Sequence, residues 1–168
     1  MSLTITRRYL PHWRHEGAIY FVTWCLAPGQ ADLAPEERTI VAKALRFFEG
    51  ERYHLFAWVV MNDHVHLVVL PIGTWKLDGL IHTWKSFTAN AMRKRGRTGP
   101  VWLPEAYDRI VRDHEDLVGK ATYVVSNPSR RWPGQEGYQW VGEGSGWQVI
   151  DSEGMPAFPF EGKVAAPS

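Results

Sequence analysis

The apolar positions of the chain follow two periods that alternate along the sequence. The segment from Ile19 to Leu26 is rich in aromatic and β-branched residues, which is typical of a strand. Pro35, followed by Glu36 and Glu37, predicts a helix start, because proline fits the first turn and acids suit the positive end of the helix dipole. Gly50 is the predicted end of this helix. Its apolar face consists of Ile40, Val41, Ala44, Leu45 and Phe48.

Two further apolar runs are separated by a short polar pair. They extend from Tyr53 to Met61 and from His64 to Pro71, with Asn62 and Asp63 between them. Asn and Asp both tolerate the left-handed conformations of a tight turn. We therefore predict a β-hairpin.

The chain then returns to helical spacing. The apolar face of this second helix consists of Leu77, Leu80, Ile81, Trp84, Phe87 and Ala91. The helix ends in a basic cluster that is a candidate for contacts with phosphates, although a solvated helix end would give the same pattern: Arg93, Lys94, Arg95 and Arg97, together with Lys85. A fourth strand is predicted from Val101 to Arg112, although Pro104 interrupts it. Asp113 is the predicted N-cap of a third helix, which ends at Asn127 because Pro128 disfavours helical geometry at the residue before it.

The predicted order is β-α-β-β-α-β-α. This order indicates an α+β fold, a mostly antiparallel sheet with helices on one face, in a domain that spans residues 1–128. Residues 129–168 are rich in Gly, Pro and Trp, and we expect an irregular tail with a short strand from Gly146 to Ile150. Three tryptophans in this tail indicate that it packs on the domain. They are Trp132, Trp140 and Trp147.

The composition predicts a cellular compartment and shows that charge is distributed unevenly along the chain. The single cysteine, Cys25, excludes an intrachain disulfide, and no apolar run approaches the roughly 20 residues of a membrane helix. Residues 1–11 also lack the apolar stretch of a signal peptide, so we expect a cytoplasmic protein without membrane contact. Residues 1–133 carry 18 Lys/Arg against 13 Asp/Glu, whereas residues 134–168 carry 1 against 5. This balance permits a polyanionic partner without requiring one.

The strongest candidate for chemistry is His64-Val65-His66, on the second strand of the predicted hairpin. Residues i and i+2 of a strand point to the same side, so both imidazoles project from one face. Two histidines at this spacing can bind one metal ion and leave positions for a third ligand and for substrate. Histidines that are merely solvated or bonded to neighbours would give the same pattern.

Tyr123 is the second candidate. The apolar side of the third helix consists of Leu117, Val118, Ala121, Val124 and Val125. Tyr123 falls on the opposite side with Asp116, Lys120 and Asn127, although a helical tyrosine usually joins the apolar stripe. Tyr123 and Asn127 are also i and i+4 neighbours. The alternative is a surface tyrosine beside an asparagine cap.

The two candidates together provide what a tyrosine nucleophile needs. A phenol with a pKa of about 10 is a weak nucleophile at neutral pH. A divalent cation beside a scissile phosphate would stabilise the transition state and orient the phosphate for in-line attack. The Asn127 carbonyl could complete a shell with His64 and His66 that suits Mg²⁺ or Mn²⁺.

Several short segments resemble one family, in the right order and spacing. MNDHVHLVVLP resembles the HUH motif of single-tyrosine transposases, and YVVSNP resembles their Y-I-x-x-N-P segment. WKSFTA and VWLPEAYDRIVRD are similar to intervening stretches of the same family. The resemblance extends from about Ile19 to Pro128 and is nearest to the REP-associated tyrosine transposases and the small insertion-sequence transposases.

This resemblance implies a ferredoxin-like fold and a DNA transposase, an endonuclease and strand transferase that acts on single-stranded DNA, often next to a hairpin. It implies that His64 and His66 are metal ligands and that Asn127 is the third. Tyr123 would form a 5′-phosphotyrosine and free a 3′-hydroxyl that rejoins strands. The family includes homodimers, in which the tyrosine serves the partner's metal site, and monomers.

Other interpretations stay open. Tyr107 is a rival nucleophile, although an aromatic residue is the usual occupant of a strand. Lys120 and the cation-rich start of the chain are further candidates for DNA contact. That start contains Arg7, Arg8, His12, Trp13, Arg14 and His15. A non-catalytic protein of the same fold that binds single-stranded DNA or RNA is the main competing function. A zinc hydrolase lacks a carboxylate or cysteine partner for the histidines at a suitable spacing.

Overall fold

The computed structural model describes residues 4–6 and 17–154. Their strands form one sheet in the order β1-β5-β2-β4-β3-β6, and every neighbouring pair is antiparallel. The strands are β1 (Thr4–Thr6), β2 (Tyr20–Cys25), β3 (Tyr53–Val60), β4 (His64–Pro71), β5 (Ala106–Ile110) and β6 (Val141–Glu143). The helices are α1 (Pro35–Phe47), α2 (Leu77–Lys94), α3 (His114–Val125), α4 (Asn127–Arg131) and α5 (Gly146–Glu153).

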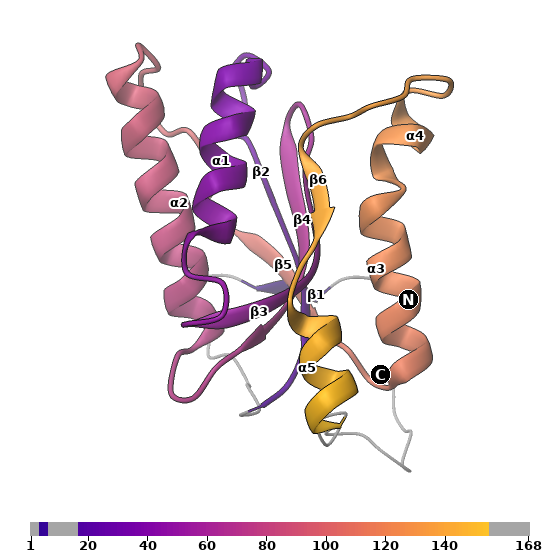
Figure 1. Ribbon diagram of the computed structural model, residues 1–168. Coiled ribbons are helices and arrows are strands. Elements are labelled where there is room, and N and C mark those ends of the chain that lie inside the picture. Colours follow the sequence, from indigo (N-terminus) through magenta and orange to yellow (C-terminus); the bar gives the residue numbers. More distant parts are fainter. Residues whose placement is uncertain (1–3, 7–16, 155–168) are drawn as a thin grey trace.

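The predicted fold class is confirmed. From β2 to α3 the elements follow the predicted order, and both crossovers, through α1 and α2, return to the same sheet (Figure 1). The four central strands therefore have the order β5-β2-β4-β3 of a ferredoxin-like sheet. In the described part of the chain, no helix is long and apolar enough to cross a membrane.

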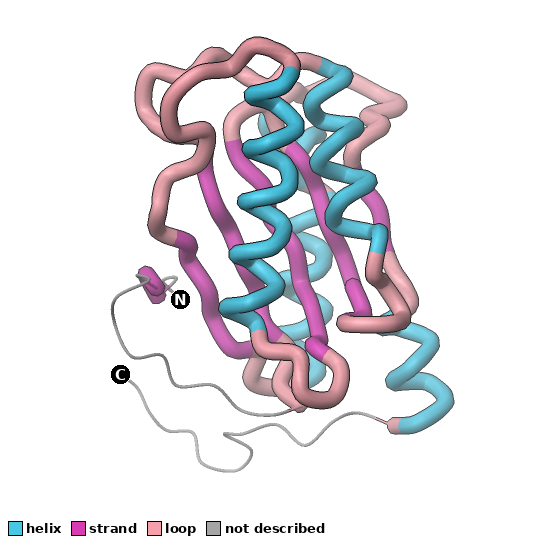
Figure 2. Tube along the Cα trace, turned by 90° about the vertical axis from the view of Figure 1, so that its left-hand side faces the viewer, coloured by secondary structure: helices cyan, strands magenta, loops and turns pink. Residues whose placement is uncertain are grey.

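The helices cover both faces of the sheet. Helices α1 and α2 lie side by side on one face, as predicted, and α3 lies on the other (Figures 1 and 2). Our expectation that all helices share one face is therefore wrong for α3. The reason lies in the central strands, because Phe56, Val59 and Val68 point away from α1 and α2 and need a second cover. Leu117 of α3 packs in their cluster and is fully buried.

The ends of the helices have local causes. Pro35 occupies the first turn of α1, and Glu37 accepts a hydrogen bond from the Ala34 backbone in a capping-box arrangement. Asp113 caps α3 by accepting from the Asp116 backbone N–H, as predicted. Helix α3 ends at Val125, and the short helix α4 begins at Asn127. Pro128 thus ends one helix and fits the first turn of the next.

The predicted hairpin forms between β3 and β4, and the Met61 N–H donates to the His64 carbonyl across its turn. The strand predicted from Val101 to Arg112 is shorter, because regular pairing starts at Ala106. Before Pro104, a single bridge joins Trp102 to Leu26.

The C-terminal segment is more regular than we predicted. It contains β6, which pairs with β3, and the strand expected from Gly146 to Ile150 is instead helix α5. All three tryptophans pack against the core clusters, which confirms that this segment packs on the domain. Residues 7–16, with their cation-rich cluster, lie outside the described residues.

Candidate active site

The two histidines of β4 lie side by side on the face covered by α3. Their ring centroids are 4.6 Å apart, and the rings meet at 72°. Strand β2 places Cys25 opposite His64 and Thr23 opposite His66. The alternation of the strand therefore gives the shared projection that the sequence predicted.

Each imidazole is oriented through its Nδ1 atom. The Nδ1 of His64 lies 2.7 Å from an Asp63 carboxylate oxygen, and the Nδ1 of His66 lies 2.6 Å from the Thr23 hydroxyl. Neither Nε2 atom is hydrogen-bonded to another residue within the described ranges. Metal-binding histidines commonly use one ring nitrogen for such a supporting bond and the other for the ion. The pair therefore has the supporting contacts that two metal ligands would need.

His66 is held in its neutral form. Burial lowers the pKa of His66 from 6.5 to about 3, and the nearby charges of His64 and Arg130 act in the same direction. The side chain is 6% exposed. A neutral imidazole retains the lone pair that a metal ion requires.

Tyr123 lies beside this pair in the same chain. Its ring centroid is 5.4 Å from that of His66 and 6.0 Å from that of Phe21. Leu117 and Val124 of the same helix are buried, whereas Tyr123 is 46% exposed. The phenol is thus accessible at the edge of the site, as its position off the apolar stripe predicted.

Arg130 contacts Tyr123 from the turn of helix that follows. Its guanidinium carbon lies 4.3 Å from the centroid of the Tyr123 ring, and one N–H donates to the Tyr123 carbonyl at 3.1 Å. Another N–H donates to the Ser126 hydroxyl. Sequence reasoning missed this residue, and its only signal was a spacing of seven positions, two helical turns, from Tyr123.

Asn127 is the first residue of α4 and is 8% exposed. Its side chain has no hydrogen bond to another residue of the described part. No group of three or more His, Cys, Asp or Glu side chains among the described residues could hold a metal ion. An ion bound by His64 and His66 would need its other ligands from an amide, a phosphate or water. The role of Asn127 as the third ligand stays a prediction.

The predicted DNA-contacting cations divide between the two faces. Lys120 lies on α3 and pairs with Asp116. The remaining cations belong to α2 or follow it, on the opposite face from the histidines: Lys85, Arg93, Lys94, Arg95 and Arg97. Lys85 donates to the carbonyls of Leu103 and Pro104. The structure therefore does not bring the α2 cluster to Tyr123.

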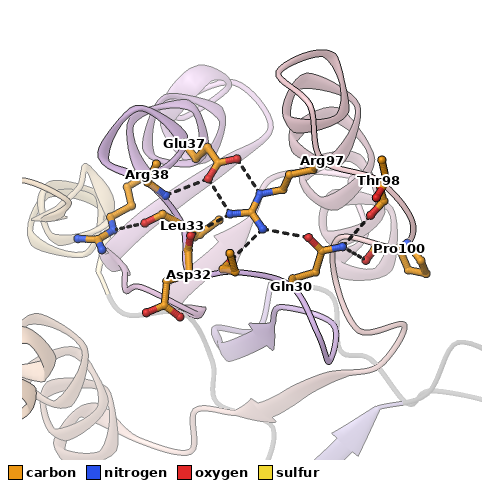
Figure 3. Close-up of polar contacts among 10 residues, drawn as sticks. Gln30, Asp32, Leu33, Glu37, Arg38, Arg97, Thr98 and Pro100 are labelled. Carbon is orange, nitrogen blue, oxygen red and sulfur yellow. Dashed lines mark hydrogen bonds and ion pairs between the residues drawn. The ribbon is translucent and has the colours of Figure 1, made fainter.

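Arg97 has a structural role instead of the predicted contact with DNA. Its guanidinium pairs with both oxygens of Glu37 and donates to Gln30 and to the carbonyls of Ala31 and Asp32 (Figure 3). These bonds use all five guanidinium N–H groups. Arg97 thus joins the segment before α1 to the end of α2 and has no donor left for a phosphate.

The rival nucleophile, Tyr107, lies on the same face but further away. It pairs with Thr23, which in turn pairs with His66, so two strand spacings, roughly 10 Å, separate the backbones of Tyr107 and His66. The geometry therefore favours Tyr123.

Comparison with known proteins gives a structural match without a sequence match. No family model matches the sequence, and no curated protein matches it. Among solved structures, the chain is similar to a REP-associated tyrosine transposase bound to a REP hairpin, with 19% identity and a TM-score of 0.65. The match covers 95% of this chain and 96% of that one. This similarity shows that the two chains share a fold.

Proposed function

We propose that this protein is a transposase-like enzyme that cleaves and rejoins single-stranded DNA, with Tyr123 as its nucleophile. The observation that carries the proposal is the 5.4 Å separation of the Tyr123 and His66 rings within one chain, with His64 beside them. The fold shared with a transposase bound to a DNA hairpin gives independent support.

The chemistry follows from the phenol. The Tyr123 hydroxyl loses its proton to solvent, and its oxygen forms a bond to the scissile phosphorus while the bond from phosphorus to the 3′ oxygen breaks. The 3′ oxygen takes up a proton, and a 5′-phosphotyrosine remains on the protein. In the reverse direction, a 3′-hydroxyl attacks the phosphotyrosine and restores the phenol. Strands are therefore rejoined without an external energy source.

His64, His66 and Asn127 would hold Mg²⁺ or Mn²⁺. The free Nε2 atoms of the histidines, their Nδ1 bonds to Asp63 and Thr23, and the buried amide of Asn127 fit such an ion. When bound, the ion would withdraw charge from the phosphate oxygens and help to orient the phosphate.

The other side chains of the site hold the nucleophile. Phe21 meets the Tyr123 ring edge-on, and Arg130 covers the ring with its guanidinium. The two contacts restrict the ring, so the phenol needs less reorganisation before attack. The Arg130 charge beside the phenol would also favour the negative charge that develops during phosphoryl transfer.

A non-catalytic DNA-binding protein of the same fold is the competing function. Such a protein has no need for a tyrosine beside two oriented imidazoles, and the arrangement therefore favours the enzyme. DNA binding that is independent of metal and gives no adduct with any divalent ion would favour the binding protein.

The experiment is a covalent-adduct assay. The protein is incubated with a labelled single-stranded oligonucleotide that contains a hairpin, in Mg²⁺, Mn²⁺ or EDTA, and resolved on a denaturing gel. We expect a shifted band with either metal and none in EDTA. Tyr123→Phe should abolish the band, whereas the matched variant Tyr107→Phe should retain it. An adduct that survives in Tyr123→Phe would contradict the assignment of the nucleophile.

A further inference from the structure

A cavity of about 670 Å³ opens beside Tyr123, between β2, β5 and α3. Two of its walls are the rings of Phe21 and Tyr123. Arg109 of β5 is the cross-strand neighbour of Phe21 of β2 and also lines the cavity. The proposed function uses the Tyr123 side of this space and leaves the rest of the cavity unexplained.

Arg109 has a buried donor without an acceptor. Its Nε atom is shielded from solvent and has no hydrogen-bond partner in the described part of the chain. A buried N–H without a partner is destabilising, because it loses its hydrogen bond to water and gains none in return. Because the Nε is shielded, a ligand oxygen in the cavity would meet the terminal Nη groups of Arg109, which is only partly buried and whose Nη groups have no hydrogen bond or ion pair in the described part of the chain. The guanidinium is therefore prepared for an anion that the protein itself does not supply.

Among the three cations that line the cavity, Arg109 is the one without a described ion pair. Arg112 and Lys120 also line the cavity, and both are paired with the same carboxylate, Asp116. Burial lowers the pKa of Arg109, and the nearby charge of Arg112 lowers it further, while Asp116 opposes this change. Three cations thus surround one shared carboxylate.

Two other acids line the cavity and do not neutralise Arg109. The Asp113 carboxylate caps α3 by accepting from the Asp116 N–H, and Glu115 is solvent-exposed. No described hydrogen bond or ion pair joins either acid to Arg109. The cavity therefore combines an available guanidinium with an aromatic wall, a combination that suits the backbone and bases of a single strand.

We propose that this cavity binds a phosphodiester of single-stranded DNA next to the one that is cleaved, with Arg109 as its hydrogen-bond donor. The inference rests on the proposed function, because Tyr123 defines which phosphate is cleaved. It replaces the α2 cluster with a binding site on the same face as the nucleophile. Phe21 provides the surface against which the adjoining sugar or base packs.

The test is DNA binding without cleavage. Binding of a fluorescent oligo-dT to the full chain is measured by anisotropy in EDTA at several salt concentrations, for wild type and Arg109→Gln. The matched control is Lys43→Gln, which removes the same charge from an exposed position of α1 on the opposite face. One lost phosphate contact lowers the slope of log affinity against log salt by about 0.7 for a single strand. We expect that loss, with weaker binding, for Arg109→Gln and an unchanged slope for Lys43→Gln.

Either of two results would overturn the proposal. One is equal slopes for wild type and Arg109→Gln, and the other is an equal loss in Lys43→Gln, which would assign the effect to the general charge of the protein. Since Arg109→Gln could also disturb the fold, a second measurement uses wild type alone. The assigned Nε–Hε NMR signal of Arg109 is followed as oligo-dT or inorganic phosphate is added.

The NMR signal also separates two sources of phosphate. We expect oligo-dT to shift the Arg109 signal to saturation, whereas inorganic phosphate at the same phosphate concentration leaves it almost unchanged. An equal response to both would indicate a site for small anions and contradict a strand site, as would no response to oligo-dT. Because EDTA prevents metal-assisted cleavage, these results do not depend on the adduct assay. Failure of the proposed function is seen only in that assay.

Discussion

The arginines on the two faces of the sheet differ in how completely their guanidinium groups are hydrogen-bonded. On the face of α1 and α2, Arg97 uses every guanidinium N–H within the chain and closes the end of the helix pair. On the face of α3, the Nε of Arg109 is buried without a described partner, and Arg130 lies over an exposed phenol. Both faces have an apolar core, so burial alone does not distinguish them. The difference teaches that the guanidinium without a described partner lies beside the candidate active site, where the proposed function needs a donor for phosphate.

The largest expected effect concerns the histidines on the α3 face of the sheet. His64→Ala should reduce metal-dependent adduct formation by roughly 10²-fold or more, because the charge stabilisation that a metal ion provides is worth several kcal/mol. His64 is partly exposed, so the fold should survive the change. The rate of adduct formation and the binding of Mn²⁺ are measured on the same samples.

The matched control for this change is His82→Ala, which removes an exposed imidazole from α2, on the opposite face of the sheet. It should leave both the adduct and the binding of Mn²⁺ as in wild type. Equal losses in the two variants would mean that the effect is not specific to the histidine of β4.

The next effect should be confined to stability. Glu37→Gln removes the charge that pairs with Arg97 and should lower the free energy of unfolding by roughly 1.5–3 kcal/mol at neutral pH. The hydrogen bond from Arg97 holds the pKa of Glu37 below its ordinary value, so the unfolded state takes up the proton first as the pH falls. The difference between the variant and wild type should therefore be full above about pH 5 and shrink as the pH drops through the ordinary range near 4.3.

Denaturant unfolding of both proteins at a series of pH values tests this prediction. The rate of adduct formation of Glu37→Gln should stay near that of wild type at a temperature where both are folded. A stability difference that grows at acid pH would show that the ion pair does not stabilise the fold.

The smallest effect should come from Arg130. Arg130→Gln should slow adduct formation roughly tenfold, because the contact of a guanidinium with an aromatic ring at a partly exposed site is worth about 1 kcal/mol and the site also loses a charge. DNA affinity should change less than the rate. Single-turnover kinetics with saturating oligonucleotide separates the two.

Two variants sharpen the Arg130 result. Arg130→Lys should recover part of the rate, since it restores the charge but not the planar contact. Arg131→Gln, which removes the neighbouring arginine from the Trp132 ring, should have no effect on the rate. A slow Arg131→Gln would assign the effect to the general charge of α4.

The sequence predicted those features of the site that depend on one element. Alternation along β4 placed His64 and His66 on one face, and helical periodicity placed Tyr123 off the apolar stripe. The contacts of Phe21 and Thr23 depend on the register of β2 against β4, which joins residues more than 40 positions apart. A single sequence contains no signal for that register.

The incorrect predictions also have physical causes. Gly146 was taken as part of a strand in an irregular tail, but it begins α5 where the chain passes close to the Phe56 ring. A Cβ at this position would lie 2.8 Å from that ring, so the glycine serves close packing. Contact between the basic cluster of α2 and DNA stays a prediction, but the sequence contains no signal that Glu37 would bind Arg97.

We propose above all that Tyr123, beside His64 and His66 on the α3 face, is the nucleophile. The most direct test is to form the adduct in Mn²⁺, digest its DNA with nuclease and locate the remaining nucleotide by mass spectrometry of tryptic peptides. The account predicts a nucleotide on the peptide of residues 121–130, which contains Tyr123. A nucleotide on the peptide of residues 98–109, which contains Tyr107, would contradict it, as would the absence of modification on either peptide.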